Sequence, residues 1–165
     1  MTWTSPHVWT TGETVTAALM NEQIKDNMQH IYDASGTVVG KRIVVLPIYS
    51  PTDVVAIGTG VSYFPIPEEY NGYNIINAQM SVVGAATAGI LTSNVIRVRG
   101  TAIATVTATP ITVDPNETSS YTAAVAGVIG TANDDVATGD FVRWDNTTAG
   151  TIAYGQFGIL TFQLP

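Results

Sequence analysis

The chain has 165 residues, of which 45% are hydrophobic, only 12% are charged and none is cysteine. Its 13 acidic and 6 basic residues give a formal net charge of −7, which excludes the basic face that nucleic-acid binding needs and disfavours anionic membrane surfaces. The absence of cysteine excludes disulfides, thiol nucleophiles and thiolate metal sites. A charged fraction about half the usual value of about 25% predicts that other copies or another protein cover much of the surface.

The first nine residues contain neither the basic region nor the apolar region of a secretory signal. The longest apolar stretch, Val82 to Leu91, is interrupted by glycine and threonine. It is much shorter than the roughly 18 apolar residues that a membrane-spanning helix requires. We therefore expect neither export nor membrane insertion.

Residues 1–40 form the first predicted unit, an N-terminal arm followed by one helix. Residues 9–13 are typical of a turn, and the Thr16 hydroxyl can cap a helix by accepting from a first-turn amide. The helix is predicted over about four turns, residues 17–32, and Gly36 suits its C-terminal end. Its apolar side chains recur at steps of three and four and form one stripe: Ala17, Met20, Ile24, Met28, Ile31 and Tyr32.

An isolated helix of this length is only marginally stable, so its stripe must be buried. The sequence leaves open whether it packs on its own domain, on other copies or on a docking partner. Two tryptophans in the short arm favour a partner or neighbouring subunit, with packing against the chain's own sandwich as the alternative. The predicted anchoring and oligomerisation residues are Trp3, Trp9, Met20, Ile24, Met28 and Ile31.

Residues 41–165 form the second predicted unit, in which Val, Ile and Thr dominate and turn residues recur every 8 to 12 residues or so. This spacing predicts a mainly β fold, an antiparallel β-sandwich that is jelly-roll-like. The expected strands are 42–49, 53–57, 61–66, 73–83, 94–99, 102–108, 111–114, 123–128, 140–145 and 156–164. The expected turns are 50–52, 58–60, 70–73, 114–116 and 146–150, and Asn71-Gly72 favours positive φ at both central positions. Alternation places Arg97 and Arg99 on one face of their strand.

Candidate chemistry is sparse, and we expect no enzyme, cofactor or metal. His30 lies four residues after Asp26 but has no nucleophile near it in any motif. Glu68 and Glu69 are adjacent and point in opposite directions in an extended segment, so they cannot flank one glycosidic bond. Two acidic loops could offer oxygen ligands to Ca²⁺, but Asp and Asn are also the preferred turn formers. These loops contain Asp114, Asn116 and Glu117, and Asp134, Asp135 and Asp140.

Aromatic residues near the 70–73 turn could stack on a sugar. Phe64 and Trp144 are expected in the core. Tyr70 and Tyr73 are the candidates for glycan contact.

Two stretches resemble proteins of tailed bacteriophages. Residues 9–21, WTTGETVTAALMN, resemble the N-terminal segment of many fibre and minor structural proteins, in which W-x-x-G-E-x-V-T-A-A-x-x-N leads into a helix. Short phrases in the second unit are similar to a β-sandwich module of virion proteins: YFPIP at 63–67, YNGYNI at 70–75, SSYTAA at 119–124, NDDVATGD at 133–140 and LTFQLP at 160–165.

This resemblance implies a non-enzymatic virion component that is assembled in the host cytoplasm. The N-terminal region would attach to portal, neck, tail or capsid proteins, and the sandwich would project. Proteins of this kind are commonly homotrimers. Because the chain lacks a long repetitive shaft, a short fibre, a spike, a collar appendage and a capsid decoration all stay open. The alternative is a receptor-binding module whose sandwich recognises a host-surface glycan.

Overall fold

The computed structural model describes residues 7–8, 10–21, 24 and 40–165. The chain divides into two compact units, Met1–Lys41 and Arg42–Pro165. The division falls beside the boundary that the change of periodicity predicts.

The described part of the first unit contains a turn and a short helix, α1 (Ala17–Met20). The amide of Glu13 donates to the carbonyl of Thr10 over 3.1 Å, which closes the turn expected here. The Thr16 hydroxyl accepts from the amide of Leu19, so the N-cap prediction is confirmed. Most of the helix predicted over residues 17–32 lies outside the described residues.

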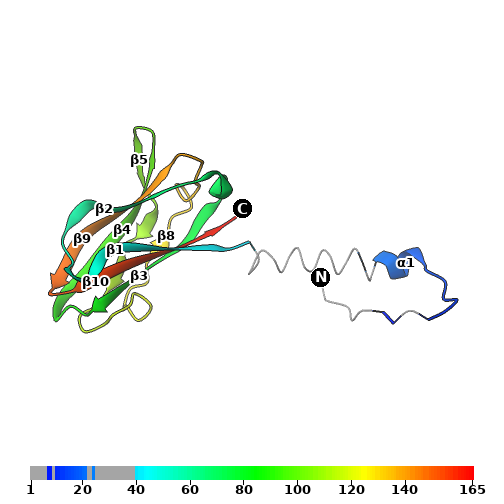
Figure 1. The fold of residues 1–165 in the computed structure, drawn as a ribbon, viewed down its shortest axis with the longest axis horizontal. Helices are drawn as coiled ribbons and strands as arrows, with labels where there is room; N and C mark the ends of the chain where they lie inside the picture. The colour runs from blue at the N-terminus through cyan, green and yellow to red at the C-terminus, as the bar shows by residue number, and fades with distance from the viewer. Residues whose placement is uncertain (1–6, 9, 22–23, 25–39) are drawn as a thin grey trace. The chain divides into compact units, whose positions relative to one another are not determined.

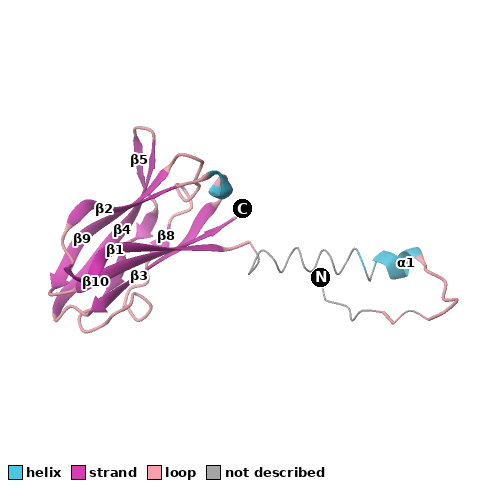
Figure 2. Cartoon of the chain, viewed as in Figure 1, coloured by secondary structure: helices cyan, strands magenta, loops and turns pink. Residues whose placement is uncertain are grey.

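The second unit is an antiparallel β-sandwich, as the sequence predicts (Figures 1 and 2). One sheet has the strand order β1-β10-β3, and the other has the order β2-β9-β4-β5, with β7 also paired to β4. A short third pair joins β6 and β8. The elements are β1 (Arg42–Val54), β2 (Gly58–Pro65), the 3₁₀ turn η2 (Glu68–Tyr70), β3 (Asn74–Gly84), β4 (Ala88–Arg99), β5 (Ala102–Thr105), β6 (Thr107–Thr109), β7 (Ile111–Val113), β8 (Val128–Ile129), β9 (Phe141–Thr151) and β10 (Tyr154–Gln163).

The connectivity is that of a jelly roll, because the chain runs through both sheets and then returns beside itself. The strands β1 to β4 alternate between the two sheets. On the return path, β9 pairs with β2 and β10 pairs with β1. Ser119 and Asp135 form bridges to β3 on that same path. This path through two packed antiparallel sheets is jelly-roll-like.

The pairing of the strands defines the two ends of the sandwich. Arg42 pairs with Phe162, and Asp135 bridges Asn74, so the start of β1, the end of β10 and the 134–140 loop share one end. We call it the terminal end. At the opposite end, the distal end, hydrogen bonds tie residues 55, 87 and 116 to neighbouring loops.

The core lies between the two sheets. Trp144 and Phe162 are its largest fully buried side chains, and the expectation that Trp144 is a core residue is therefore confirmed. Phe64 is partly buried and packs against the core. A polar cluster is also fully enclosed here: Ser93, Asn146 and Gln156 are each at most 2% exposed. Their amides and hydroxyl bond one another, which is the condition for burying such groups without penalty.

Several turns expected from local chemistry are wrong. Residues 50–52, 58–60 and 146–150 lie inside β1, β2 and β9, where shifts in the pairing register absorb them. The strand expected over 123–128 is also wrong, since only Val128 and Ile129 form β8. In the three segments expected as turns, the pairing of long neighbouring strands overrides local preference.

The turn at Asn71-Gly72 is present, but its type differs from the prediction. The amide of Tyr73 donates to the carbonyl of Tyr70 over 3.1 Å. Asn71 has φ −59° and ψ 127°, and Gly72 has φ 77°. This is a type II turn, in which only the second central residue needs positive φ. It follows a 3₁₀ turn rather than joining two hairpin strands, so the twist match that favours the predicted type is not required.

Candidate interaction surfaces

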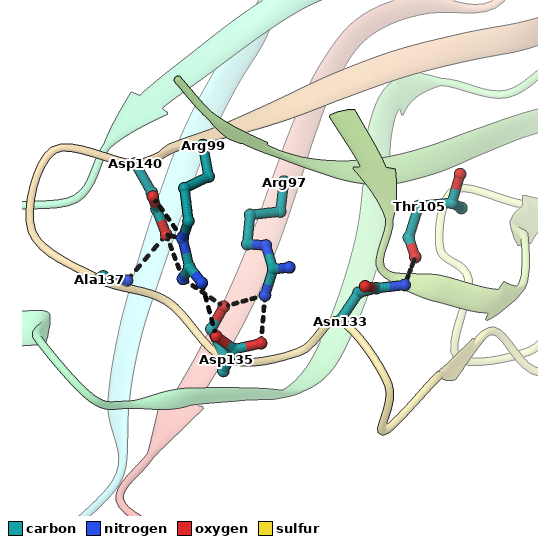
Figure 3. Close-up of polar contacts among 7 residues, drawn as sticks. All are labelled: Arg97, Arg99, Thr105, Asn133, Asp135, Ala137 and Asp140. Carbon is teal, nitrogen blue, oxygen red and sulfur yellow. Dashed lines mark hydrogen bonds and ion pairs between the residues drawn. The ribbon is translucent and has the colours of Figure 1, made fainter. Parts of the chain in front are cut away.

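A cluster of ion pairs closes the terminal end of the sandwich (Figure 3). Arg97 and Arg99 lie on the face of β4 that carries the fully buried Val95, so the prediction that they share a face is confirmed. Both guanidinium groups bind the carboxylate of Asp135. Arg99 also binds Asp140 through two nitrogens, at 3.0 and 2.7 Å. The cluster therefore fastens the 134–140 loop to β4.

The loop in turn is fastened to both sheets. The amide of Ile75 donates to the carbonyl of Asp134 at the start of β3, and the amide of Ile66 donates to the carbonyl of Asp140 after β2. The Asp140 carboxylate is 4% exposed and accepts from the amide of Ala137 over 2.8 Å. The acidic residues considered for Ca²⁺ thus include two whose charges are neutralised by arginine.

These contacts shift the pKa values of both carboxyl groups. Burial raises the pKa of Asp140, but hydrogen bonds from Arg99 and the Ala137 amide outweigh it, and the pKa is lowered overall. Burial likewise raises the pKa of Asp135, and the hydrogen bonds and charges of Arg99 and Arg97 lower it overall. The hydrogen bond to Asp140 raises the pKa of Arg99.

Acid is therefore expected to destabilise the sandwich. A carboxyl group whose pKa is lower in the folded protein contributes stability above its unfolded pKa of about 3.9, and this contribution is lost as the pH falls through the folded value. Urea unfolding at pH 7 and pH 3 should show the loss. Asp140→Asn should cost about 1.5 to 3 kcal/mol at pH 7, the usual range for a hydrogen bond to a charged group. Its stability should also fall less between the two pH values; an unchanged pH dependence would contradict this role for Asp140.

The two tyrosines considered for glycan contact lie in an aromatic cluster at the same end. Tyr73 is 8% exposed and belongs to the core. The Arg42 guanidinium lies 5.1 Å from the ring centroids of both Tyr70 and Tyr73, and its Nε donates to the Tyr73 hydroxyl. Tyr70 also packs edge-on against Phe162 at 5.0 Å. Burial leaves Tyr73 no free ring face on which a sugar could stack.

The second acidic loop is held by turn contacts of its own. The amide of Glu117 donates to the carbonyl of Asp114, which confirms the turn expected over 114–116. The Asp114 carboxylate accepts from the amide of Ala124, and the Glu117 carboxylate accepts from the Thr122 hydroxyl. Asn116 has φ 67°, a conformation that Asn tolerates better than most residues. Within the described ranges, no group of three acidic or histidine side chains is arranged to hold a metal ion.

The N-terminal unit presents apolar side chains on its described residues. Met20 and Ile24, four residues apart, are 40% and 46% exposed. Glu13, of the W-x-x-G-E segment, accepts from the amide of Thr10 and contacts His7. The hydrogen bond from the Thr10 amide is the main cause that lowers the pKa of Glu13. The other predicted anchors, Trp3, Trp9, Met28 and Ile31, and the pair of Asp26 and His30, lie outside the described residues.

One surface that sequence reasoning missed is the outward face of the β1-β10-β3 sheet. Three cross-strand rows of three residues form it, and none of the nine is ionisable. Ile43 and Val45 are 66% and 58% exposed on β1. We call this surface the neutral face. Its rows are Ile43, Thr161 and Asn77; Val45, Ile159 and Gln79; and Pro47, Phe157 and Ser81.

A signal for this face was present in the sequence. Residues 43–46, Ile-Val-Val-Leu, are apolar without alternation. A strand of this kind is typical of sheets covered on both faces. In the sandwich, Val44 and Leu46 face the core, and the other two residues face outward.

No family model, curated protein or solved structure matches the chain. Among the described helices, none combines the length and apolar character needed to cross a bilayer.

Proposed function

We propose that the chain is a non-enzymatic structural component of a bacteriophage particle, homo-oligomeric and attached through its N-terminal region. The observation that carries the proposal is the pair Met20 and Ile24, which lie four residues apart and are exposed on a unit separate from the sandwich. Exposed apolar residues at this spacing suit burial against another helix or a docking groove. Met20 is the last residue of α1, and both residues belong to the helix predicted after the phage-like W-x-x-G-E segment.

The sandwich adds a second argument. The chain enters it at Arg42 and leaves it at the same end, since Arg42 pairs with Phe162. A module that is tethered at one end can present its distal end away from the attachment point. This arrangement suits a short fibre, a spike or a decoration protein.

A double variant, Met20→Asp with Ile24→Asp, tests the attachment. Particles of the phage that encodes the chain should contain the wild-type protein, detected by mass spectrometry after density-gradient purification. The double variant should be reduced at least about tenfold, because each buried apolar side chain contributes about 1.5 to 3 kcal/mol. The control is Ile57→Asp, which changes an apolar residue of the sandwich that is more exposed, 67% against 40% for Met20 and 46% for Ile24. Equal incorporation of both variants would contradict attachment through the N-terminal unit, and a particle without the wild-type chain would overturn the whole proposal.

Glycan recognition is tested separately with the full chain on a glycan array. A scaffolding role predicts that no glycan binds. Specific binding would favour the receptor-binding alternative.

A further inference from the structure

We propose that the neutral face is the surface through which the sandwiches of different copies of this chain contact one another, each face turned toward the others about a common symmetry axis. This inference rests on the proposed homo-oligomer and identifies which part of the sandwich the copies share. It is argued from charge, hydrogen-bonding capacity, strand-edge chemistry and size.

Charge favours a second copy as the occupant. The chain carries a net charge of −7, so two copies repel each other wherever acidic side chains meet. The nine positions of the neutral face include none of these groups. The outward side of the other sheet differs, since it carries the ion pair of Arg143 and Asp145. The neutral face thus lets identical copies approach without opposing like charges.

The polar side chains of the neutral face can also form hydrogen bonds with the same side chains of another copy. Asn77, Gln79, Ser81 and Thr161 line its rows on β3 and β10. Amide and hydroxyl groups both donate and accept hydrogen bonds, so they can pair with the same groups on another copy. The apolar part, on β1 and β10, supplies exposed area, with Val45 directly opposite Ile159.

Association through the sheet edges is less suited to this chain. β1 is an edge strand and contains Pro47 and Pro51. Proline lacks the amide hydrogen that a new neighbouring strand would need, which is why it protects strand edges. The other edge, β3, is partly covered by the bridges to Ser119 and Asp135. The β1-β10-β3 sheet is therefore better suited to associate with another copy through its face than through its edges.

The size of the face sets the strength expected. Three strands about 4.8 Å apart, at about 3.3 Å per residue over the stretch of β10 from Phe157 to Thr161, span about 14 by 17 Å. Stable complexes bury about 800 Å² per partner, so this face alone supports only weak contact. An N-terminal attachment would raise the effective concentration of the sandwiches and make such contact persistent.

Single-cysteine cross-linking of the full chain tests the contact, because the natural sequence has no cysteine. Val45→Cys and the control Ile103→Cys replace residues of similar exposure, 58% and 63%, on the neutral face and on the β5 hairpin. A short bis-maleimide reagent should convert Val45→Cys to a covalent dimer about tenfold more than Ile103→Cys, since thiols held together in an oligomer have a high effective concentration. Thr161→Cys, in the adjacent row, replaces Val45→Cys if circular dichroism shows that the latter is unfolded.

Light scattering on the same samples separates the two proposals. An oligomer in which Val45→Cys or Thr161→Cys cross-links no more than Ile103→Cys would overturn this inference and leave the proposed function standing. A monomer at micromolar concentration would overturn the homo-oligomer and this inference with it. An oligomer with preferential cross-linking on the neutral face supports both.

Discussion

Replacing Asn146 with leucine is expected to lower the free energy of unfolding by about 3 to 5 kcal/mol, because several buried groups would lose their partner at once. Asn146 is 2% exposed and donates to Gln156 Oε1 over 2.7 Å and to the Ala56 carbonyl over 3.2 Å. Its own oxygen accepts from Ser93 Oγ over 2.6 Å and from Gln156 Nε2 over 3.0 Å. Urea unfolding at pH 7 measures the loss.

A triple variant is the control for this prediction. Ser93→Ala, Asn146→Leu and Gln156→Leu together remove the whole side-chain cluster instead of leaving parts of it unpaired. Replacing all partners by apolar groups costs less than removing one, because no buried side-chain donor or acceptor of the cluster is left without a bond. The triple variant should therefore lose less unfolding free energy than the three single variants lose together. Additive losses would show that the cluster does not act as a unit.

This cluster shows what periodicity can and cannot reveal. The outline of the sandwich was predictable, because β-branched residues alternate over most strands and turn residues separate them. Nothing in the local sequence indicates that Asn146 is buried, since local chemistry predicts a turn over 146–150. Its partners Ser93 and Gln156 come from different strands, and Ser93 is 53 residues away. Contacts between distant strands depend on topology, which local patterns do not encode.

The ion pairs of the terminal end follow the same logic. The alternation along β4 placed Arg97 and Arg99 together, and the acidic 134–140 loop stood out in composition. The link between them joins Arg99 to Asp140, 41 residues later. Once the jelly-roll connectivity brings this loop beside β4, a cluster first considered for oxygen ligation becomes a set of arginine partners. Local chemistry identified the residues, and the fold assigned their roles.

The start of α1 was predictable for a different reason. The Thr16 cap and the Thr10–Glu13 turn depend only on residues three positions apart, so the sequence contains all the information needed. Met20 and Ile24 are exposed, which agrees with the prediction that the apolar stripe of the helix is available to a partner. What covers the stripe remains a prediction, together with the anchoring roles of Trp3 and Trp9.

The alternation that indicates a core face in β1 does not reveal the neutral face. Ile43 and Val45 alternate with Val44 and Leu46, so the apolar run fits either face equally well. A strand buried on both sides in a sandwich of two sheets requires a third covering layer. Such a run at the start of a two-layer fold therefore agrees with the proposed contact between copies.

Truncating Trp144 to alanine is the second change with a large expected effect, about 3 to 5 kcal/mol of unfolding free energy. The side chain is fully buried, and among the described residues its Nε1 has no hydrogen-bond partner. The loss is therefore one of packing, without a broken hydrogen bond. Gly158, on the facing sheet, makes room for the ring: a Cβ added there would lie 2.8 Å from Trp144 Cζ3. Gly158→Ala alone should cost about 1 to 3 kcal/mol through overpacking.

The two changes should compensate each other in part. In the Trp144→Ala background, the added methyl group of Gly158→Ala enters the space that the indole leaves, so overpacking is relieved and the cavity is smaller. The double variant should then lose less unfolding free energy than the two single variants lose together. The difference should be about 0.5 to 3 kcal/mol, the usual range for residues in contact. Chemical unfolding of the four proteins gives this coupling energy. A coupling near zero would contradict direct packing of Gly158 against Trp144.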